Sequence, residues 1–183
     1  MIIGGDNMKI LVCTKKHCHS NKSEELLKSL EDSNVEFTHS ACMHMCDDGP
    51  NVFTFPDLKM YGHVDKSRLQ DIISGNSDGL EYDDEIYNLE INKQYSLDPM
   101  HKRTVKLFRW HLAKHDDISV RGIERMIGTF MKKYDVEGID FSYPIKVALI
   151  KTIKGPDLPK LINYLGKNST MILFDEFLKK GNQ

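Results

Sequence analysis

Apolar and polar residues follow each other along the first part of the chain in a pattern that predicts a small mixed sheet with helices. Segments with strand periodicity are separated by two segments whose leucines and isoleucines recur at helical spacing. A strand-helix-strand unit gives a parallel pair with a right-handed crossover, and two strands joined by a tight turn give an antiparallel hairpin. The expected strands are residues 9–14, 35–40, 51–56 and 58–64, and the expected helices are residues 21–33 and 65–75.

Local signals predict where these elements begin and end. Asn21 followed three positions later by Glu24 can form a capping box, and Asp65 is a good N-cap for the closing helix. Gly75 suits the end of that helix, because glycine adopts the left-handed conformation common after a helix C-terminus. Residues 56–57, Pro-Asp, predict the turn between the last two strands.

The second part of the chain has a helical pattern. Residues 76–98 are acidic and rich in turn formers, which indicates a linker, and Asp98-Pro99 then gives an N-cap followed by a first-turn proline. Residues 145–153 are ambiguous, because they are β-branched enough for a strand but follow a proline that could start a helix. The other expected helices are residues 102–115, 118–134, 158–166 and 170–181.

Charge divides the chain in the same way. The net charge is only −2 over 183 residues, but residues 1–100 hold 9 Lys/Arg and 18 Asp/Glu, a balance of −9. Residues 101–183 hold 16 and 9, a balance of +7. This asymmetry predicts a first domain over residues 1–75 and a basic, mainly helical domain over residues 99–183, joined by the acidic linker.

Composition is that of a soluble globular protein, with 40% apolar and 28% charged residues. No apolar run reaches the roughly 18 residues of a membrane span, and the N-terminus lacks the pattern of a signal peptide. We therefore expect a cytoplasmic protein. Met8 could itself be the start, with residues 1–7 as a dispensable extension.

The four cysteines of the chain fall into two pairs, Cys13 with Cys18 and Cys42 with Cys46. The first pair follows one strand of the expected parallel pair and the second pair follows the other. Because parallel strands end at the same edge of a sheet, both cysteine loops should emerge side by side. In a reducing compartment this convergence predicts a tetrathiolate metal site, either structural zinc or an iron–sulfur cluster.

The residues around the cysteines resemble one family. Residues 8–75 contain C-x₄-C and C-x₃-C, followed by Gly-Pro, an apolar strand ending in proline and a Tyr-Gly-x-Val strand. This succession of motifs resembles the thioredoxin-like [2Fe–2S] ferredoxins. The resemblance implies a thioredoxin-like, four-stranded mixed sheet with two helices, so that the whole chain is α/β (α+β) with a mainly helical C-terminal domain. The positions that carry it are Cys13, Cys18, Cys42, Cys46, Gly49, Pro50, Pro56, Tyr61 and Val64.

This resemblance also implies a function. One [2Fe–2S] cluster held by Cys13, Cys18, Cys42 and Cys46 would pass single electrons between a reductase and an acceptor protein. The chain would be an electron carrier rather than an enzyme, as a subunit or partner of an oxidoreductase, and the family also suggests a homodimer. Two alternatives stay open, which are a structural zinc module whose basic half binds nucleic acid and a cluster-based redox sensor.

The basic half contains aromatic residues interspersed with its lysines and arginines. This composition allows nucleic-acid binding, but it is also typical of a solvated helix surface over an aromatic core, or of a dock for an acidic partner. We favour the solvated surface, so nucleic acid is not expected among the partners. The aromatic residues concerned are Phe108, Trp110, Phe130, Tyr134 and Tyr143.

Overall fold

The computed structural model describes residues 8–15, 18, 22–45, 49–77, 93–96 and 98–179. The chain divides into two compact units, which we treat separately. The first comprises Met1–Tyr82 with Lys154–Asp157, and the second comprises Asp83–Ile153 with Leu158–Gln183.

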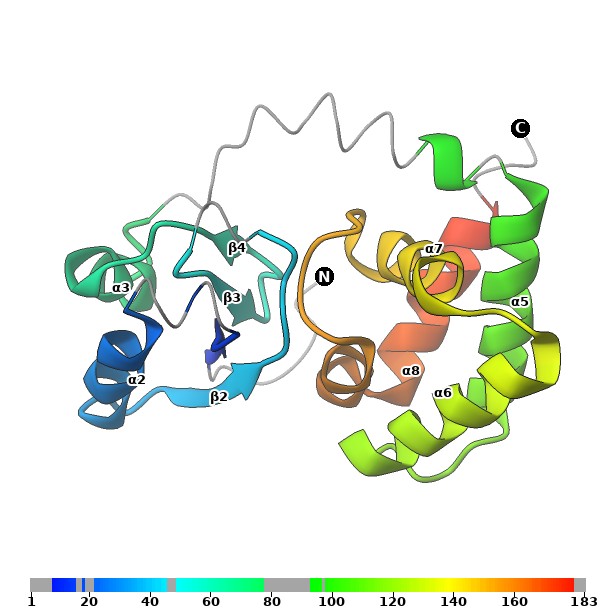
Figure 1. Cartoon of the computed structure of the whole chain (residues 1–183), viewed down its shortest axis with the longest axis horizontal. Helices are drawn as coiled ribbons and strands as arrows, with labels where there is room; N and C mark the ends of the chain where they lie inside the picture. The colour runs from blue at the N-terminus through cyan, green and yellow to red at the C-terminus, as the bar shows by residue number, and fades with distance from the viewer. Residues whose placement is uncertain are drawn as a thin grey trace. The chain divides into compact units, whose positions relative to one another are not determined.

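The first unit is built on a four-stranded mixed sheet with the strand order β2-β1-β3-β4 (Figure 1). β1 pairs in parallel with β2, from Lys9 opposite Glu36 to Cys13 opposite Ser40. It pairs antiparallel with β3, which in turn pairs antiparallel with β4. The strands are β1 (Lys9–Cys13), β2 (Glu36–Ser40), β3 (Val52–Phe55) and β4 (Met60–Tyr61).

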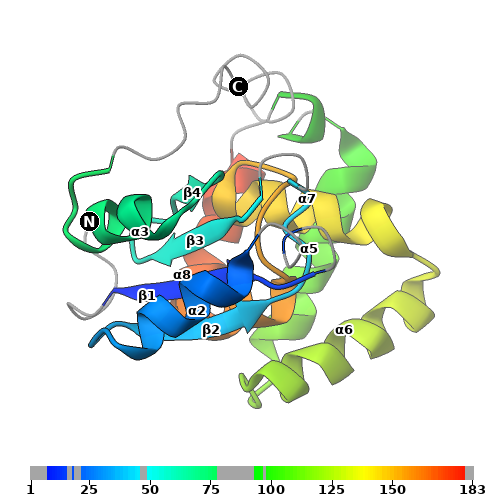
Figure 2. The ribbon, with the colours of Figure 1, turned by 60° about the vertical axis from the view of Figure 1, so that its left-hand side comes forward.

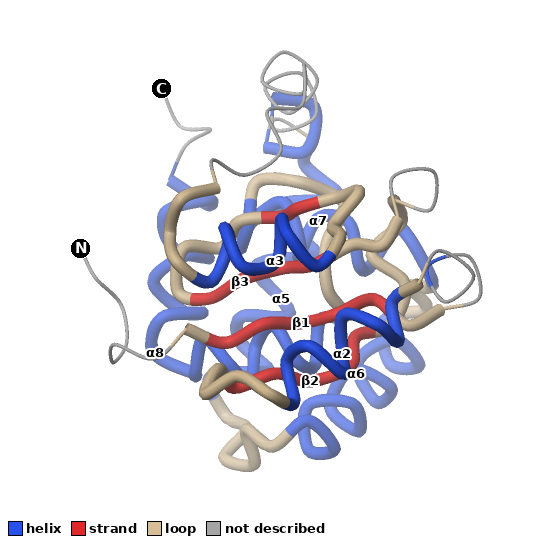
Figure 3. The backbone as a smooth tube through the Cα atoms, turned by 90° about the vertical axis from the view of Figure 1, so that its left-hand side faces the viewer, coloured by secondary structure: helices blue, strands red, loops and turns tan. Residues whose placement is uncertain are grey.

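Two helices cover one face of this sheet. α2 (Ser23–Glu31) and α3 (Lys66–Ile73) lie side by side over the strands (Figures 2 and 3). The core between helices and sheet forms because every second residue of β1 points to the helices, and these residues meet the apolar stripes of α2 and α3. Its buried members are Ile10, Val12, Leu26, Leu30, Val52, Tyr61, Val64, Leu69 and Ile72.

The predicted signals at both ends of α3 are confirmed. The Asp65 side chain accepts a hydrogen bond from the backbone N–H of Arg68 at 2.8 Å, and Gly75 follows α3 with a positive φ of 74°. The start of α2 differs from the prediction, because its N-cap is Lys22, in a left-handed conformation and without a side-chain cap hydrogen bond. The predicted cap, Asn21, lies outside the described residues.

The second unit consists of helices (Figure 1). α5 contacts α6, α7 and α8, and α8 also contacts α6 and α7. The predicted proline-capped helix is confirmed, since the Asp98 carboxylate accepts hydrogen bonds from the N–H groups of Met100 and His101. The helices are α5 (Pro99–Ala113), α6 (Val120–Tyr134), α7 (Gly138–Ile150) and α8 (Leu158–Lys179).

Two segments of this unit needed the structure to define them. The ambiguous segment at 145–153 belongs to α7 up to Ile150, and Pro144 lies inside the helix rather than at its start. Because α7 is apolar on most sides, it is buried among its neighbours and lacks the two-sided pattern of a surface helix. α8 is interrupted at Gly166 (φ 71°, ψ 163°), which separates the two helices that the sequence predicts there.

An aromatic cluster forms the core of the second unit. Phe108 of α5 is fully buried, and its ring meets those of Phe130, Phe141 and Phe174 edge-on, with centroids 5.4, 5.2 and 6.0 Å away. Edge-to-face pairs at these distances are favourable in addition to the burial of apolar area. One side chain of α5 therefore packs against rings from all three other helices.

The predicted fold class is confirmed: a four-stranded mixed sheet with two helices is followed by a mainly helical part. The division into domains at 75 and 99 stays a prediction, and much of the predicted linker lies outside the described residues. Within the described residues, no helix has the length and apolar character to span a membrane.

Candidate functional site

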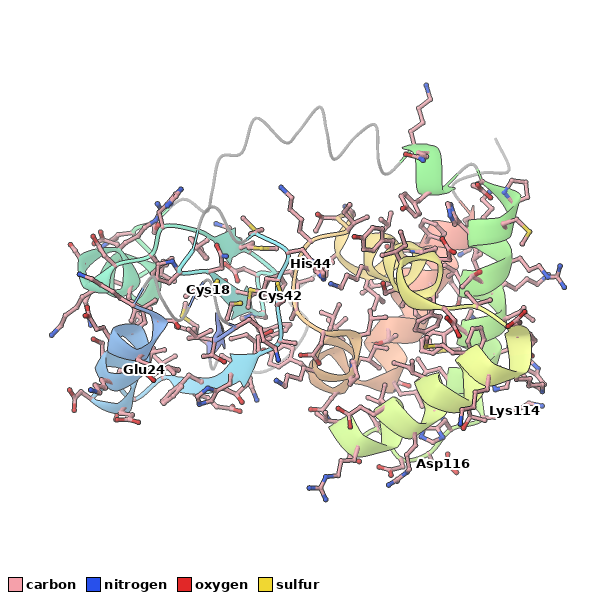
Figure 4. The ribbon with its side chains drawn as sticks, viewed as in Figure 1. Cys18, Glu24, Cys42, His44, Lys114 and Asp116 are labelled. Atoms are coloured by element: carbon pink, nitrogen blue, oxygen red, sulfur yellow. The ribbon has the colours of Figure 1, made fainter. Side chains whose placement is uncertain are left out.

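Three of the four cysteines lie in the described part of the first unit. Cys13 ends β1 and is buried, Cys18 is buried, and Cys42 follows β2 and is half-buried. Figure 4 labels Cys18 and Cys42. Cys46 lies outside the described residues. The role of the four thiols as one ligand set therefore stays a prediction.

Cys18 has a dry environment. Burial, and then the neighbouring Cys13 thiol, raises the pKa of Cys18 to about 12. The side-chain amide of Asn51, also buried, donates to the Cys18 sulfur at 3.5 Å and to the carbonyl of Met45. Burial therefore disfavours the thiolate form of Cys18.

Across the described ranges, no three His, Cys, Asp or Glu side chains come together in a way that could hold a metal ion. Cys42 accepts a hydrogen bond from the backbone N–H of His44 at 3.4 Å. The described part of the first unit therefore contains the buried thiols of Cys13 and Cys18 and the half-buried thiol of Cys42. Within it, no three side chains are arranged to hold a metal ion.

The second unit presents a different surface. α5 contains four Lys/Arg residues and no Asp or Glu. Two of them and the single tryptophan of the chain recur at helical spacing on the solvent side of α5, and the C-cap residue Lys114 continues this line; all four side chains are exposed. We call this set the α5 stripe: Arg103, Lys106, Trp110 and Lys114.

Arg109, another basic residue of α5, forms an ion pair within the second unit. Arg109 lies off the stripe, and its guanidinium donates to the Asp175 carboxylate of α8 at 2.8 Å. This pair ties α5 to α8 while the stripe faces outward. Arg109 therefore contributes to helix packing, whereas the basic residues of the stripe face solvent.

Trp110 is the centre of a cationic cluster formed by α5 and α6. The indole is 47% exposed, and the Lys114 ammonium lies 3.7 Å from its ring centroid. The ammonium of Lys133, in the last turn of α6, lies 5.9 Å from the same ring and 5.4 Å from that of Tyr134. Both ammonium groups are within the range of cation–π attraction.

A histidine–tyrosine pair supports this cluster. His111 Nε2 and the Tyr134 hydroxyl share a hydrogen bond at 3.0 Å, and the His111 ring meets that of Trp110 edge-on at 5.0 Å. Burial, and then the charges of Lys133 and Lys114, lowers the pKa of His111 below its usual 6.5. The imidazole is therefore neutral at pH 7, and the positive charge of the cluster belongs to the two lysines.

The turn between α5 and α6 is fixed by α8. Lys167 donates to the carbonyl of His115 at 2.9 Å, and the Asn163 amide donates to the carbonyl of Ile118 at 2.8 Å. Figure 4 labels Lys114 and Asp116 at this turn. Because the turn is held at two points, the C-terminal end of α5 and the start of α6 keep a defined spacing.

The cluster could not be identified from the sequence. Lys114 and Lys133 are 19 positions apart, and only the packing of α5 on α6 brings both to Trp110. The sequence did show interspersed basic and aromatic residues. It could not show that Trp110 is exposed while Phe108 and Phe130 form the core.

Comparison with known proteins points to the second unit. The family described as an anticodon binding domain matches residues 69–172. The match begins in α3, includes α5, α6 and α7, and ends in α8.

The chain is also similar to one relative and to one solved structure. Over 141 residues the chain is 26% identical to "Glutamate--tRNA ligase 2" of Caldanaerobacter subterraneus subsp. tengcongensis, covering 67% of this chain and 29% of the ligase. The chain thus spans under a third of that relative. It is also similar to the thioredoxin-like [2Fe-2S] ferredoxin from Aquifex aeolicus, with a TM-score of 0.36 and 20% identity, over 42% of this chain and 94% of that one. A score this low supports no further conclusion.

These findings correct the function expected from the cysteines. Electron transfer between redox partners is wrong as the function, and so is the [2Fe–2S] cofactor, because the matched family is described by anticodon binding and the described residues assemble no metal-holding group. The expectation that nucleic acid is not a partner is also wrong. The cysteine pattern is local to the first unit, so it carries no information about residues 99–183.

The matched residues make up more than half of the chain, and they contain the helices that carry the α5 stripe and the Trp110 cluster. The chain belongs to the anticodon binding domain family.

Proposed function

We propose that this protein binds tRNA through its helical second unit, with the α5 stripe against the RNA backbone. The description of its family and the name of its ligase relative both support tRNA as the partner. The proposal is confined to binding, because the chain covers 29% of that ligase. In this proposal residues 1–75 and 99–183 are separate domains, and the protein works in the cytoplasm, where tRNA is charged.

One observation about α5 carries the proposal. α5 has four basic residues and no acidic residue, and Lys114 follows it as its C-cap. Arg103, Lys106 and Lys114 lie on one exposed face, around an exposed tryptophan. Phosphates supply most of the affinity of nucleic acids for proteins, and lysine and arginine neutralise them. A face free of carboxylates avoids the repulsion that would oppose such contacts.

The stripe also has a suitable length for more than one phosphate. Arg103 and Lys114 are 11 residues apart, which is about 16 Å along a helix axis. Lys133 adds positive charge from α6 at the Trp110 end of this line. The surface can therefore contact successive phosphates of one strand.

Binding of the full-length chain to a fluorescently labelled tRNA, followed by anisotropy, tests the proposal. Charge reversal within the stripe, Lys106→Glu, should weaken tRNA binding by about tenfold or more, because it removes one phosphate contact and repels another. The matched control is Lys66→Glu, an exposed lysine of α3 in the first unit and outside the matched residues 69–172. Equal affinity of the two variants would contradict the proposed surface.

A further inference from the structure

Trp110 differs from the other large rings around it in its exposure. Phe108 and Phe130 are buried to within 1% of their surface, whereas Trp110 leaves 47% of its surface to solvent. A large indole in solvent forgoes the favourable burial of apolar area. On a helix whose neighbouring exposed residues are cationic, this arrangement suits a ligand with both a flat ring and negative charge.

The cluster already shows how such a ligand would be held. Lys114 lies over the indole at 3.7 Å, so one face of the ring is covered by an ammonium group, and Lys133 stands further out at 5.9 Å. The hydrogen bond to Tyr134 fixes the His111 ring, which contacts the indole edge-on. The ring is thus held in place, whereas the lysine covering it has a long and flexible side chain.

We propose that Trp110 is a stacking platform for one unpaired base of the bound RNA, and that Lys114 yields the ring face to this base and moves to an adjacent phosphate. This inference rests on the proposed function, and it specifies the chemical class recognised at the Trp110 end of the α5 stripe. The ligand there is a nucleobase in a single-stranded segment. Lys133 contacts the backbone on the α6 side.

The ligand is an unpaired base because of how RNA presents its ring faces. In a duplex both faces of each base are occupied by neighbouring bases, whereas in loops and bulges bases can stack on aromatic side chains. Paired RNA could meet the lysines but could not place a base on Trp110. The cluster should therefore favour a loop over a duplex.

The exchange of Lys114 for a base is favourable on ordinary magnitudes. An exposed cation–π contact contributes about 2- to 5-fold to an equilibrium, which is what the base must overcome. Base–aromatic stacking contributes about 5- to 150-fold per base. The released ammonium then gains a phosphate contact.

The test uses the full-length chain with three probes: an RNA hairpin with an unpaired loop, a fully paired RNA of the same length, and free adenosine. Since Trp110 is the only tryptophan of the chain, its fluorescence reports on this site alone. The hairpin should quench this emission and the paired RNA should quench it far less. Trp110→Leu should weaken hairpin binding by about 5- to 150-fold, measured by anisotropy, while Trp110→Phe should lose less.

Lys114→Gln tests the exchange itself. Removing the ammonium clears the ring face, so adenosine, which has no phosphate, should quench Trp110 at about 2- to 5-fold lower concentration than in the wild type. Hairpin binding should weaken, because one phosphate contact is lost. Unchanged adenosine binding would overturn the exchange.

The outcomes separate this inference from the proposed function. If the wild type binds neither tRNA nor the hairpin, both are overturned. If it binds them and Trp110→Leu binds the hairpin equally tightly, the stacking platform alone is overturned. Circular dichroism of each variant checks the fold, which we expect to be unchanged because the substituted side chains are exposed.

Discussion

The salt dependence of RNA binding can be worked out from the charges on the proposed surface. Three basic residues of the α5 stripe, together with Lys133, give four cations that can neutralise phosphates: Arg103, Lys106, Lys114 and Lys133. Each contact releases counterions, and for single-stranded nucleic acid the slope of log K against log salt is about −0.7 per contact. Four contacts predict a slope of about −2.8.

This slope gives a measurable loss of affinity. Raising monovalent salt from about 50 to about 200 mM should weaken binding by about 50-fold for the wild type. Neutralising one stripe residue, Lys106→Gln, leaves three contacts. The slope should therefore become shallower, at about −2.1, and the loss of affinity over the same salt range should be about 20-fold. Anisotropy titrations of the hairpin at five or so salt concentrations give both slopes.

The control for this prediction is Lys66→Gln in the first unit, which should keep the wild-type slope. A wild-type slope shallower than about −1 would mean that the four cations do not meet phosphates. The same slope for Lys106→Gln and the wild type would refute the assignment of Lys106 to the contact surface.

Three further predictions concern stability, all measured by urea unfolding through the single tryptophan. Phe108→Ala should cost about 3–5 kcal/mol, because it removes a fully buried ring. Gly122→Ala should cost about 1–3 kcal/mol, since a Cβ there would lie 2.3 Å from Asp117, whereas the control Gly128→Ala meets nothing within 4 Å and should stabilise by up to about 1 kcal/mol. Because the pKa of His111 is lowered in the folded state, the unfolded chain binds a proton first as the pH drops. The free energy of unfolding should therefore fall as pH drops through 6.5 and level off below the folded-state pKa. His111→Gln should lose this part of the pH dependence.

The fold was largely predictable because its signals act over short distances. The Asp65 and Asp98 carboxylates cap helices through N–H groups two or three residues away, and Gly75 follows its helix with a positive φ. Apolar runs placed the end of β1 and the start of β3 to within one residue. The start of α2 was less predictable, because Lys22 precedes it without a side-chain cap.

The function was predicted from the cysteines of the first unit, whereas the family match lies mainly in the second unit. The four cysteines as one ligand set stay a prediction. Four cysteines with regular spacing are a strong local pattern, and they led to a cluster and to redox partners that the family match contradicts. The basic and aromatic residues near Trp110 were visible in the sequence, but composition alone does not separate a solvated surface from a contact surface. What distinguishes them is which rings are buried.

The sequence alone is sufficient for the order of strands and helices along the chain, for the N-caps of α3 and α5 and for the division into an acidic and a basic half. These depend on periodicity, caps and charge, each of which acts within a few residues. Only the tertiary structure decided that Trp110 stays exposed beside Lys114 while Lys133 reaches the same ring from α6. The reason is that the cluster depends on which faces of α5 and α6 pack together. The buried contact between Phe108 and Phe130 sets this packing, and no residue of the cluster itself does so.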